Sequence, residues 1–482
     1  MRELDYTLRQ ARTAQQLWAR RSLRERLQPV ANLRARLARE PQVLAAVVAA
    51  EIGKTRFEAI GTEVLPVADV CAFLCERADE ILRPRRESLR GTMPFAGHAT
   101  VRHVPWGVVA SIVPWNYPLL LCAGPALNAL VAGNAIVMKP SPRAKNTVAA
   151  FARWLHEAGF PAELAPVLDC SDENGRALAA SPLIDKIVFT GSSKTGRAVL
   201  NAAAINLVPA TMELSGFDAV HVLADADVKL AAAAVAFGVR LNAGRTCVCP
   251  RRVFVDRSVA AELKERLAQK LSTLELLAPM DSQTLIEADA LAAKLSALGA
   301  KNLNGRTPGD CKKALLFSGD AQAMRAAEGN FVPALVLMEV ADAAQALQEE
   351  SASRYALGAS IFSRSLEQVM RVAGDVPSGM VAVNECVAPA GEAALPFGGA
   401  HESGYGVRGG VEGLLEMTRP QSLAFARGNF RPHHLAGEEA EELLLALLRA
   451  RHAPGIFSRA GGWISYAIES VKWIRGISKL RK

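Results

Sequence analysis

Residues 104–138 read VPWGVVASIVPWNYPLLLCAGPALNALVAGNAIVM and contain no Asp, Glu, Lys or Arg. An apolar stretch of this length could span a membrane as one helix. Repeated Pro and Gly residues exclude one continuous helix. The pattern predicts instead a strand at 107–113, a helix at 119–131 and a strand at 135–139. Continuous apolar strands joined by a helix are typical of a buried parallel sheet, so the stretch predicts an α/β fold.

Strands and helices alternate along the rest of the chain. Before this stretch, residues 4–40 predict an Arg-rich helix with a solvated face, interrupted at Pro29. After it, further strands are predicted at 164–168, 185–189, 252–255, 331–340, 359–362 and 379–384, with helices at 147–158, 174–180, 228–240, 260–271 and 283–297. The remainder of 274–329 is expected to be loop.

Gly191-Ser192 follows the strand predicted at 185–189 and precedes a helix. Such a turn presents free N–H groups and a positive helix end to a phosphate. It differs from a P-loop because Arg197 and Ala198 stand where Lys and Ser or Thr are required, which excludes a kinase or ATPase. The Gly-x-Gly-x-x-Gly at 404–409 has no strand before it and is not a dinucleotide fingerprint.

The net charge of +8 lies at the two ends of the chain. Residues 1–40 hold ten Arg against four acids, and 431–482 hold nine Lys and Arg against five acids. A nucleic-acid groove would place the surplus on the folded body, so nucleic acid is not an expected partner. The eight cysteines are scattered and lack metal-ligand spacing, so neither a disulfide framework nor a metal site is predicted.

Cys247 follows a Gly-containing turn and precedes an apolar run. A cysteine placed in this way favours a cleft, where a helix start or nearby cations would lower the pKa of the thiol. Glu213 ends an apolar segment and supplies the carboxylate for covalent catalysis followed by attack of water. The alternative is structural, since most free cysteines are small buried apolar residues. Cys249 is the competing nucleophile.

Six short blocks occur in order along the chain. They are Pro114-Trp115-Asn116-Tyr117-Pro118, Gly133-Asn134 through Lys139-Pro140-Ser141, Phe189-Thr190-Gly191-Ser192, Glu213-Leu214-Ser215-Gly216, Asn242-Ala243-Gly244-Arg245-Thr246-Cys247, and Pro396-Phe397-Gly398-Gly399 with Ser403-Gly404. Together they resemble the NAD(P)-dependent aldehyde dehydrogenase superfamily over residues 44–425. The chain is identified as a member of the hydrolytic, non-acylating type, with a shortened catalytic domain and a C-terminal extension.

The resemblance implies two Rossmann-type α/β domains and a small β oligomerisation arm. The dinucleotide-binding domain is expected at 1–85 and 104–215, and the catalytic domain at 216–415. The arm is expected at 86–103 and 416–430, and a helical extension at 431–482. A homodimer or homotetramer is implied. The N-terminus lacks the apolar segment of a signal peptide, which favours the cytoplasm.

The resemblance also assigns roles to residues. Cys247 would attack an aldehyde, Asn116 and the Cys247 N–H would hold the oxyanion, and Glu213 would activate water. NAD or NADP would contact residues in several blocks, namely Trp115, Lys139, Ser141, Gly191, Ser192, Glu350 and Phe397. Of these, Gly191 and Ser192 would hold the pyrophosphate and Lys139 the adenosine ribose, while Glu350 and Phe397 would lie at the nicotinamide end.

Two departures from the family pattern bear on the cofactor. A ribose-binding Glu is replaced by Pro142, and Arg143 and Lys145 follow it, which should tolerate the 2′-phosphate of NADP. Glu349-Glu350 begins a Glu-Glu-x-Phe-Gly-Pro motif, but the Phe-Gly-Pro segment and about twenty further residues of the family pattern are absent. A catalytically silent, cofactor-binding relative is therefore the alternative to an active enzyme.

The tail beyond the family match predicts helices at 438–448 and 463–480. The second places Ile464, Ile468 and Val471 on one face and Lys472, Arg475, Lys479 and Lys482 on the other, with Trp463 and Trp473 at the margin. Such a helix suits peripheral contact with a membrane surface through 463–482 and is too polar to span the bilayer. The alternative is a helix docked on the domain or on a dimer partner.

Overall fold

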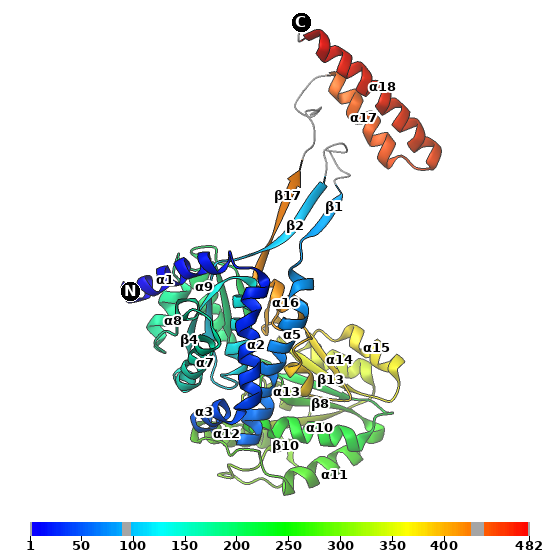
Figure 1. Ribbon diagram of the computed structural model, residues 1–482. Helices are drawn as coiled ribbons and strands as arrows, with labels where there is room; N and C mark the ends of the chain where they lie inside the picture. Colours follow the sequence, from blue (N-terminus) through cyan, green and yellow to red (C-terminus); the bar gives the residue numbers. More distant parts are fainter. Residues whose placement is uncertain (1, 89–97, 426–437, 481–482) are drawn as a thin grey trace. The chain divides into compact units, whose positions relative to one another are not determined.

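The computed structural model describes residues 2–88, 98–425 and 438–480. The chain forms two compact units (Figure 1). The larger unit comprises Met1–Pro84 and Arg102–Gln421, and the smaller comprises Arg85–Val101 and Ser422–Lys482. The larger unit contains the two main sheets and every residue of the candidate active site.

The first main sheet has the strand order β16-β6-β5-β3-β4. Four strands are parallel, and β16 pairs antiparallel at the edge. The bounds are Val108–Val113 (β3), Ala135–Pro140 (β4), Lys186–Thr190 (β5), Ala210–Glu213 (β6) and Gly404–Tyr405 (β16). Helix α6 (Leu120–Ala132) connects β3 to β4, so the strand–helix–strand unit predicted over 104–138 is confirmed.

Helices α7 (Lys145–Ala158), α8 (Asp172–Ala179) and α9 (Ser193–Ala204) complete this domain. The strand predicted at 164–168 is wrong. That stretch follows a 3-10 turn at Ala162–Leu164 and makes one isolated bridge, between Met138 and Val167. Pro166 in its middle has no N–H to donate to a strand ladder, which explains the difference.

Helices precede the first sheet in the chain. They are α1 (Arg2–Trp18), α2 (Leu23–Arg39), α3 (Pro41–Ile52), α4 (Arg56–Ala59) and α5 (Leu65–Leu82). The break predicted at Pro29 is wrong, because Pro29 lies inside α2 and a Ser22–Glu25 capping box starts that helix. The predicted solvated face is also partly wrong, since Arg12 pairs with Asp185 at 2.6 Å and so attaches α1 to the sheet domain.

The second main sheet has the order β14-β13-β7-β8-β11-β10-β9, parallel except for β9. Its strands are Asp218–Val222 (β7), Pro250–Asp256 (β8), Lys301–Asn302 (β9), Leu315–Ser318 (β10), Ala334–Val340 (β11), Gly358–Phe362 (β13) and Met380–Val383 (β14). Its main helices are α10 (Val228–Arg240), α11 (Arg257–Thr273), α12 (Ser282–Ala297), α14 (Ala343–Ser351) and α15 (Leu366–Asp375). The predicted α/β class is confirmed.

Part of this second sheet was not predicted. β10 falls in a segment expected to be loop, and β7 was also missed. A run of four or five apolar residues is too short to show a period, so only pairing with neighbouring strands defines these elements.

In the smaller unit, β1 (Arg85–Ser88) pairs antiparallel with β2 (His98–Pro105), in a sheet completed by β17 (Thr418–Phe425). These strands fall where the arm was expected, and the parts of that prediction at 89–97 and 426–430 lie outside the described residues. The C-terminal helices are α17 (Glu438–His452) and α18 (Ile456–Leu480). None of the helices in the described ranges is long and apolar enough to cross a membrane.

Candidate active site

Cys247 lies in the loop between α10 and β8, just after an unusual turn. Asn242, Ala243 and Gly244 all have positive φ angles, of 48°, 50° and 70°. Left-handed backbone is unfavourable for residues with a Cβ. At Gly244 a Cβ would also collide with the backbone of Pro333, so glycine is required there. The loop that carries the candidate nucleophile is therefore strained and must be held by its neighbours.

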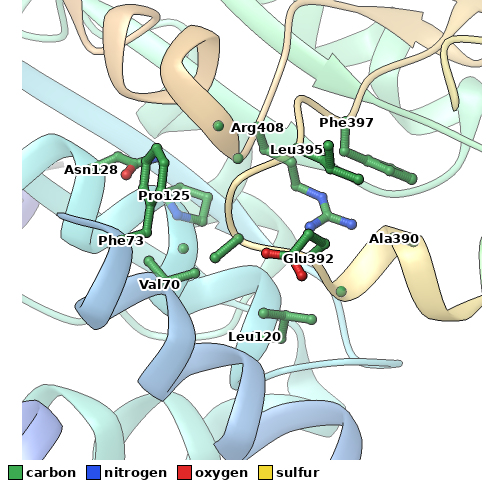
Figure 2. Close-up of a pocket in the computed structure, with 15 residues that line it drawn as sticks. Val70, Phe73, Leu120, Pro125, Asn128, Ala390, Glu392, Leu395, Phe397 and Arg408 are labelled. Carbon is green, nitrogen blue, oxygen red and sulfur yellow. The ribbon is translucent and has the colours of Figure 1, made fainter. Parts of the chain in front are cut away.

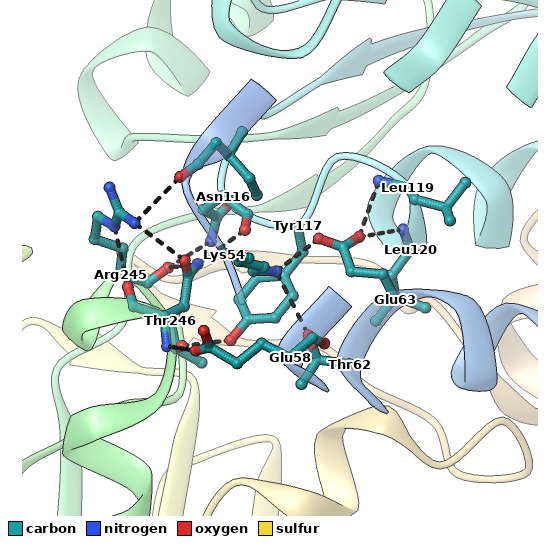
Figure 3. A network of polar contacts seen from close by, with 12 residues as sticks. Lys54, Glu58, Thr62, Glu63, Asn116, Tyr117, Leu119, Leu120, Arg245 and Thr246 are labelled. Carbon is teal, nitrogen blue, oxygen red and sulfur yellow. Dashed lines mark hydrogen bonds and ion pairs between the residues drawn. The ribbon is translucent and has the colours of Figure 1, made fainter. Parts of the chain in front are cut away.

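Side chains from distant parts of the chain hold this turn (Figure 3). Glu58 Oε1 accepts a hydrogen bond from the Asn242 N–H at 2.7 Å. The Asn242 amide donates to the carbonyl oxygen of Asn116 at 2.9 Å, and Arg245 Nε donates to the Asn242 carbonyl at 3.0 Å. All four residues are buried. The first sheet domain and α4 thus fix a loop that belongs to the second domain.

Cys247, Glu213 and Arg408 form a chain of contacts. The Cys247 thiol donates to Glu213 Oε1 at 3.6 Å, and Arg408 Nε donates to Glu213 Oε2 at 2.6 Å. Burial and the nearby Glu213 charge raise the pKa of Cys247, although Arg408 opposes them. The expectation of a lowered thiol pKa is therefore wrong. The charged group in contact with the sulfur is an anion, Glu213.

Both the backbone and the side chain of Asn116 form hydrogen bonds with the loop that carries Cys247. Asn116 Nδ2 donates to the Arg245 carbonyl oxygen at 3.2 Å, two residues before Cys247. The next residue, Tyr117, shares a 2.6 Å hydrogen bond with the Thr246 hydroxyl. Among the described residues no acceptor takes the Cys247 backbone N–H. The structure thus brings together Cys247, Glu213 and Asn116, the three residues predicted to be catalytic.

A buried ion pair supports the Asn116 side of the site. Lys54 Nζ and Glu63 Oε1 are 2.6 Å apart with both side chains fully buried. Glu63 Oε2 accepts the backbone N–H groups of Leu119 and Leu120, and the Lys54 ammonium lies 3.5 Å from the centre of the Tyr117 ring (Figure 3). Burial raises the pKa of Glu63 and lowers that of Lys54, while each partner opposes the shift of the other.

The predicted phosphate-binding turns lie at the carboxyl ends of parallel strands. Ser141 follows β4 and caps a short turn by accepting the Arg143 N–H. Ser192 follows β5 and caps α9 by accepting the Thr195 N–H at 3.2 Å. Beside it, a Cβ on Gly191 would collide with the Phe189 ring at 2.6 Å. The first N–H groups of α9 therefore have the geometry predicted for binding an anion.

Arg143, expected to meet a 2′-phosphate, already has partners. Its guanidinium lies 3.6 Å from the centre of the Trp115 ring and bonds Asp281 at 2.7 Å. Asp281 also pairs with Arg245 at 3.0 Å. Although burial opposes it, hydrogen bonds from Thr284 and the two guanidinium groups lower the pKa of Asp281 to about 2. Lys145, which is exposed, remains as the cation near this turn.

Glu350 is not brought to the cleft. It lies at the end of α14, 1% exposed, with Oε2 2.6 Å from His221 Nε2. Only three residues separate α14 from β12 (Tyr355–Ala356), so no segment replaces the absent Phe-Gly-Pro motif. The predicted contact of Glu350 with the nicotinamide end thus lacks geometric support, because its carboxylate faces the interior of the second domain.

Phe397 does lie beside the catalytic group. Its ring is 4.1 Å from the Arg408 guanidinium, and the two backbones exchange hydrogen bonds of 2.8 Å. Figure 2 shows the Arg408 side chain entering a small cavity beside Phe397 and Glu392. Sequence analysis missed Arg408, since it lies in the glycine-rich segment dismissed as a false fingerprint. The same analysis also assigned no role to Lys54 or Glu63.

A larger cavity, open to solvent, reaches Cys247. It is lined by residues of α5, the start of α6, α10 and the segment 387–392. Thr246, Cys247 and Arg408 are part of its wall. The thiol therefore has access to a small molecule, as a nucleophile requires, whereas Cys249 is fully buried.

Comparison with known proteins identifies the family. The sequence profile described as "Aldehyde dehydrogenase family" matches residues 1–423. The chain belongs to the aldehyde dehydrogenase family. The resemblance seen in the six blocks is thereby confirmed, together with the enzyme class.

Relatives of this aldehyde dehydrogenase differ in their named substrates. A 4,4′-diapolycopene aldehyde oxidase of Methylomonas sp. is 34% identical over 455 residues, covering 90% of this chain and 84% of the relative. A Mycolicibacterium smegmatis protein, provisionally named an NADP⁺-dependent succinate-semialdehyde dehydrogenase, is 30% identical over 435 residues, covering 86% and 83%. The crystal structure of a Mycobacterium tuberculosis aldehyde dehydrogenase complexed with NAD⁺ matches with a TM-score of 0.82 and 27% identity, covering 89% and 91%.

The buried ion pair gives a prediction about stability. Lys54→Met in this aldehyde dehydrogenase should destabilise the fold by roughly 3–5 kcal/mol, because it leaves the Glu63 charge buried without its partner. Denaturant unfolding measures the loss. Lys54→Met combined with Glu63→Gln is the control, since glutamine still accepts from Leu119 and Leu120 but carries no charge. If the double variant is as unstable as the single one, the charge of Glu63 is not the cause.

Proposed function

We propose that this enzyme oxidises an aldehyde to a carboxylic acid with NAD or NADP, through a thioester on Cys247 that water hydrolyses. The observation that carries the proposal is the 3.6 Å contact between the Cys247 thiol and the Glu213 carboxylate at the wall of an open cavity. A thiol in hydrogen-bond reach of a base is the arrangement that nucleophilic catalysis requires.

The first step follows from the raised pKa of Cys247. A thiol that burial keeps protonated needs a base, and Glu213 Oε1 already accepts its hydrogen. As the sulfur bonds to the aldehyde carbon, its proton moves to Glu213, and the carbonyl oxygen gains negative charge. Asn116 Nδ2 and the Cys247 N–H are the proposed donors to that oxygen, and losing one such donor typically costs about a hundred- to a thousandfold in turnover.

The residues at the carboxyl ends of β4 and β5 fit a dinucleotide. Lys139 is 6% exposed and burial lowers its pKa, yet no carboxylate among the described residues forms an ion pair with it. A buried ammonium with unused donors suits ribose hydroxyls, and the α9 terminus behind Gly191 and Ser192 suits a pyrophosphate. Trp115, Ser141 and Phe397 are the further proposed contacts. A dinucleotide bound there supplies the two-electron oxidant that turns the thiohemiacetal into a thioester.

Hydrolysis of the thioester is assigned to Glu213 and Arg408. We propose that Glu213 first releases to solvent the proton that it took from Cys247. It then takes a proton from water as the water oxygen bonds to the thioester carbon and the Cys247 sulfur leaves. The Arg408 guanidinium holds Glu213 Oε2, which leaves Oε1 directed at the sulfur. Arg408 is therefore proposed as a positioning residue for the base.

The alternative function is a silent relative that binds the cofactor without turnover. The buried position of Glu350 and the direct link from α14 to β12 favour it, because the nicotinamide end then lacks one expected contact. The grouping of Cys247, Glu213 and Asn116 favours the active enzyme. Formation of NADH or NADPH from an aldehyde decides between them.

We also propose that two copies pair through the small sheet. β1 and β17 are both edge strands, and their unpaired backbone groups can accept another strand. A homodimer or a homotetramer would result, with a mass of twice or four times 51.4 kDa in sedimentation equilibrium.

Replacing the proposed nucleophile gives the first functional prediction. Cys247→Ala should lower the rate of cofactor reduction by roughly a thousandfold or more with the fold intact, because no thioester can form. Cys249→Ala is the matched control. Its sulfur is buried and donates to the Pro250 carbonyl, so the variant should retain most activity. Retained activity in Cys247→Ala with loss in Cys249→Ala would reverse the assignment.

Replacing the proposed base, Glu213, gives the second functional prediction. Glu213→Gln should slow both thioester formation and hydrolysis, each by about a hundredfold or more, because Glu213 is the proposed base for the thiol and for water. Rapid-mixing absorbance measures both phases. Arg408→Gln should slow both phases, but less than Glu213→Gln does, and Arg408→Lys should restore part of each rate. Unchanged rates of both phases in Glu213→Gln would overturn both roles proposed for that residue.

A further inference from the structure

The walls of the cavity at Cys247 are apolar over most of their surface. Residues of α5, the start of α6, α10, the Cys247 loop and the segment 387–392 line it. The large apolar residues among them include Leu65, Leu120, Leu121, Phe237, Leu241 and Val387. A wall of this kind binds the hydrocarbon part of a ligand and offers it no hydrogen bonds.

The charges at the cavity are acidic. Asp69 and Glu392 both line it, and burial together with the Glu392 charge raises the pKa of Asp69. Arg408 is the single basic residue among the lining residues, and its guanidinium is held by Glu213. A substrate that carries a carboxylate would meet two acids and no available cation.

The apolar surface continues beyond this cavity. Leu65, one of its lining residues, is 55% exposed although it is large and apolar. The smaller cavity of Figure 2 shares Leu120 and Arg408 with the larger one and is also lined by Val70 and Phe73. The space next to the thiol thus suits an extended chain rather than a compact molecule.

We propose that the substrate is an aldehyde with an extended hydrocarbon chain and no acidic group at its far end. The inference rests on the proposed function and specifies its substrate class. It separates the two kinds of substrate named among the relatives, since the walls suit an apolar aldehyde and lack a partner for the carboxylate of a semialdehyde. The aldehyde carbon reaches Cys247 while the chain lies between Leu121 and Phe237.

The test is a series of straight-chain aldehydes from propanal to dodecanal, with succinate semialdehyde beside them. Transfer of a methylene group from water to an apolar wall should raise kcat/KM by roughly two- to fourfold per carbon while the chain lies in the cavity. Succinate semialdehyde should be slower than pentanal. If it is faster, or if chain length has no effect, the substrate class is wrong while the proposed function stands. No turnover with any aldehyde would instead contradict the proposed function.

A wall variant adds a second measurement. Phe237→Lys places a charge in the lining, so kcat/KM for dodecanal should fall at least tenfold, and that for propanal should fall far less. Ile286→Lys is the matched control, because Ile286 is 64% exposed on α12 and does not line the cavity. An equal fall for both aldehydes in Phe237→Lys would show a general effect and would overturn the role of this wall.

A second inference concerns α17 and α18 and rests on separate observations. The two helices pack through a small apolar cluster of Leu443, Ala446, Leu447 and Tyr466. On the face of α18 opposite Tyr466, Phe457, Ile464, Ile468 and Val471 are 93%, 63%, 50% and 47% exposed. The predicted face is thus present over the described side chains, whereas Trp473, Arg475, Lys479 and Lys482 of that prediction lie outside them.

The charge of this segment complements an anionic surface. Residues 438–482 contain eight Lys and Arg against five Glu, and four of these Glu lie in the first five residues of α17. An exposed apolar face flanked by cations is what a helix needs to lie in the plane of a membrane that contains anionic lipids. We infer that the α17–α18 hairpin attaches the enzyme to an anionic phospholipid surface, with Phe457 and Ile464 inserted among the lipid chains.

Co-sedimentation of the full chain with vesicles tests this. Binding is expected to vesicles of phosphatidylcholine with phosphatidylserine, and at least tenfold weaker binding to phosphatidylcholine alone. Ile464→Ser with Ile468→Ser should abolish it, and Leu207→Ser, at a 90% exposed residue outside the hairpin, should not. Protein that remains in the supernatant with both vesicles would overturn the inference. So would an Ile464→Ser, Ile468→Ser variant that changes only the oligomeric mass, since the face would then bind a second copy.

Discussion

The position of the nucleophile depends on one carboxylate. Glu58 is 1% exposed, and its Oε1 holds the N–H of Asn242 at the start of the left-handed turn. Its Oε2 closes a capping box with Thr55 at the start of α4. A helix terminus in one domain thus fixes a strained loop in the other, and the buried hydrogen bonds stabilise a conformation that costs on the order of 1–3 kcal/mol for each unfavourable residue.

Burial sets the chemistry of the thiol as well as its position. In water a cysteine is partly ionised near neutral pH, but here desolvation and the Glu213 charge raise the pKa of Cys247. The sulfur therefore remains a neutral thiol until a substrate arrives, and the base that deprotonates it is already in contact. Arg408 donates a hydrogen bond to the second carboxylate oxygen of that base. The thiol, the carboxylate and the guanidinium thus form one chain of hydrogen bonds at the wall of a cavity that is open to solvent.

Elsewhere in the larger unit, charged side chains also pair with one another and leave the cavity wall apolar. Lys54 and Glu63 neutralise each other beneath the turn that carries Asn116, and Arg245 and Arg143 share Asp281 at the other side of Trp115. The basic groups in these pairs are thus already bonded to structural partners. The wall of the cavity at Cys247 therefore consists mainly of apolar residues and two acids. Such a wall favours substrates with uncharged chains.

The sequence by itself determined the α/β class and the first strand–helix–strand unit, because apolar runs are local signals. Its six blocks, through the family resemblance, also assigned Cys247, Glu213 and Asn116 to one site. It did not determine the pKa of the thiol, the interior position of Glu350 or the part played by Arg408. Each depends on a partner far along the chain: Glu213 is 34 residues from Cys247, His221 is 129 from Glu350, and Arg408 is 195 from Glu213. Only the packing of the two sheets brings such groups together and removes water from around them, and electrostatic effects are large where water is excluded.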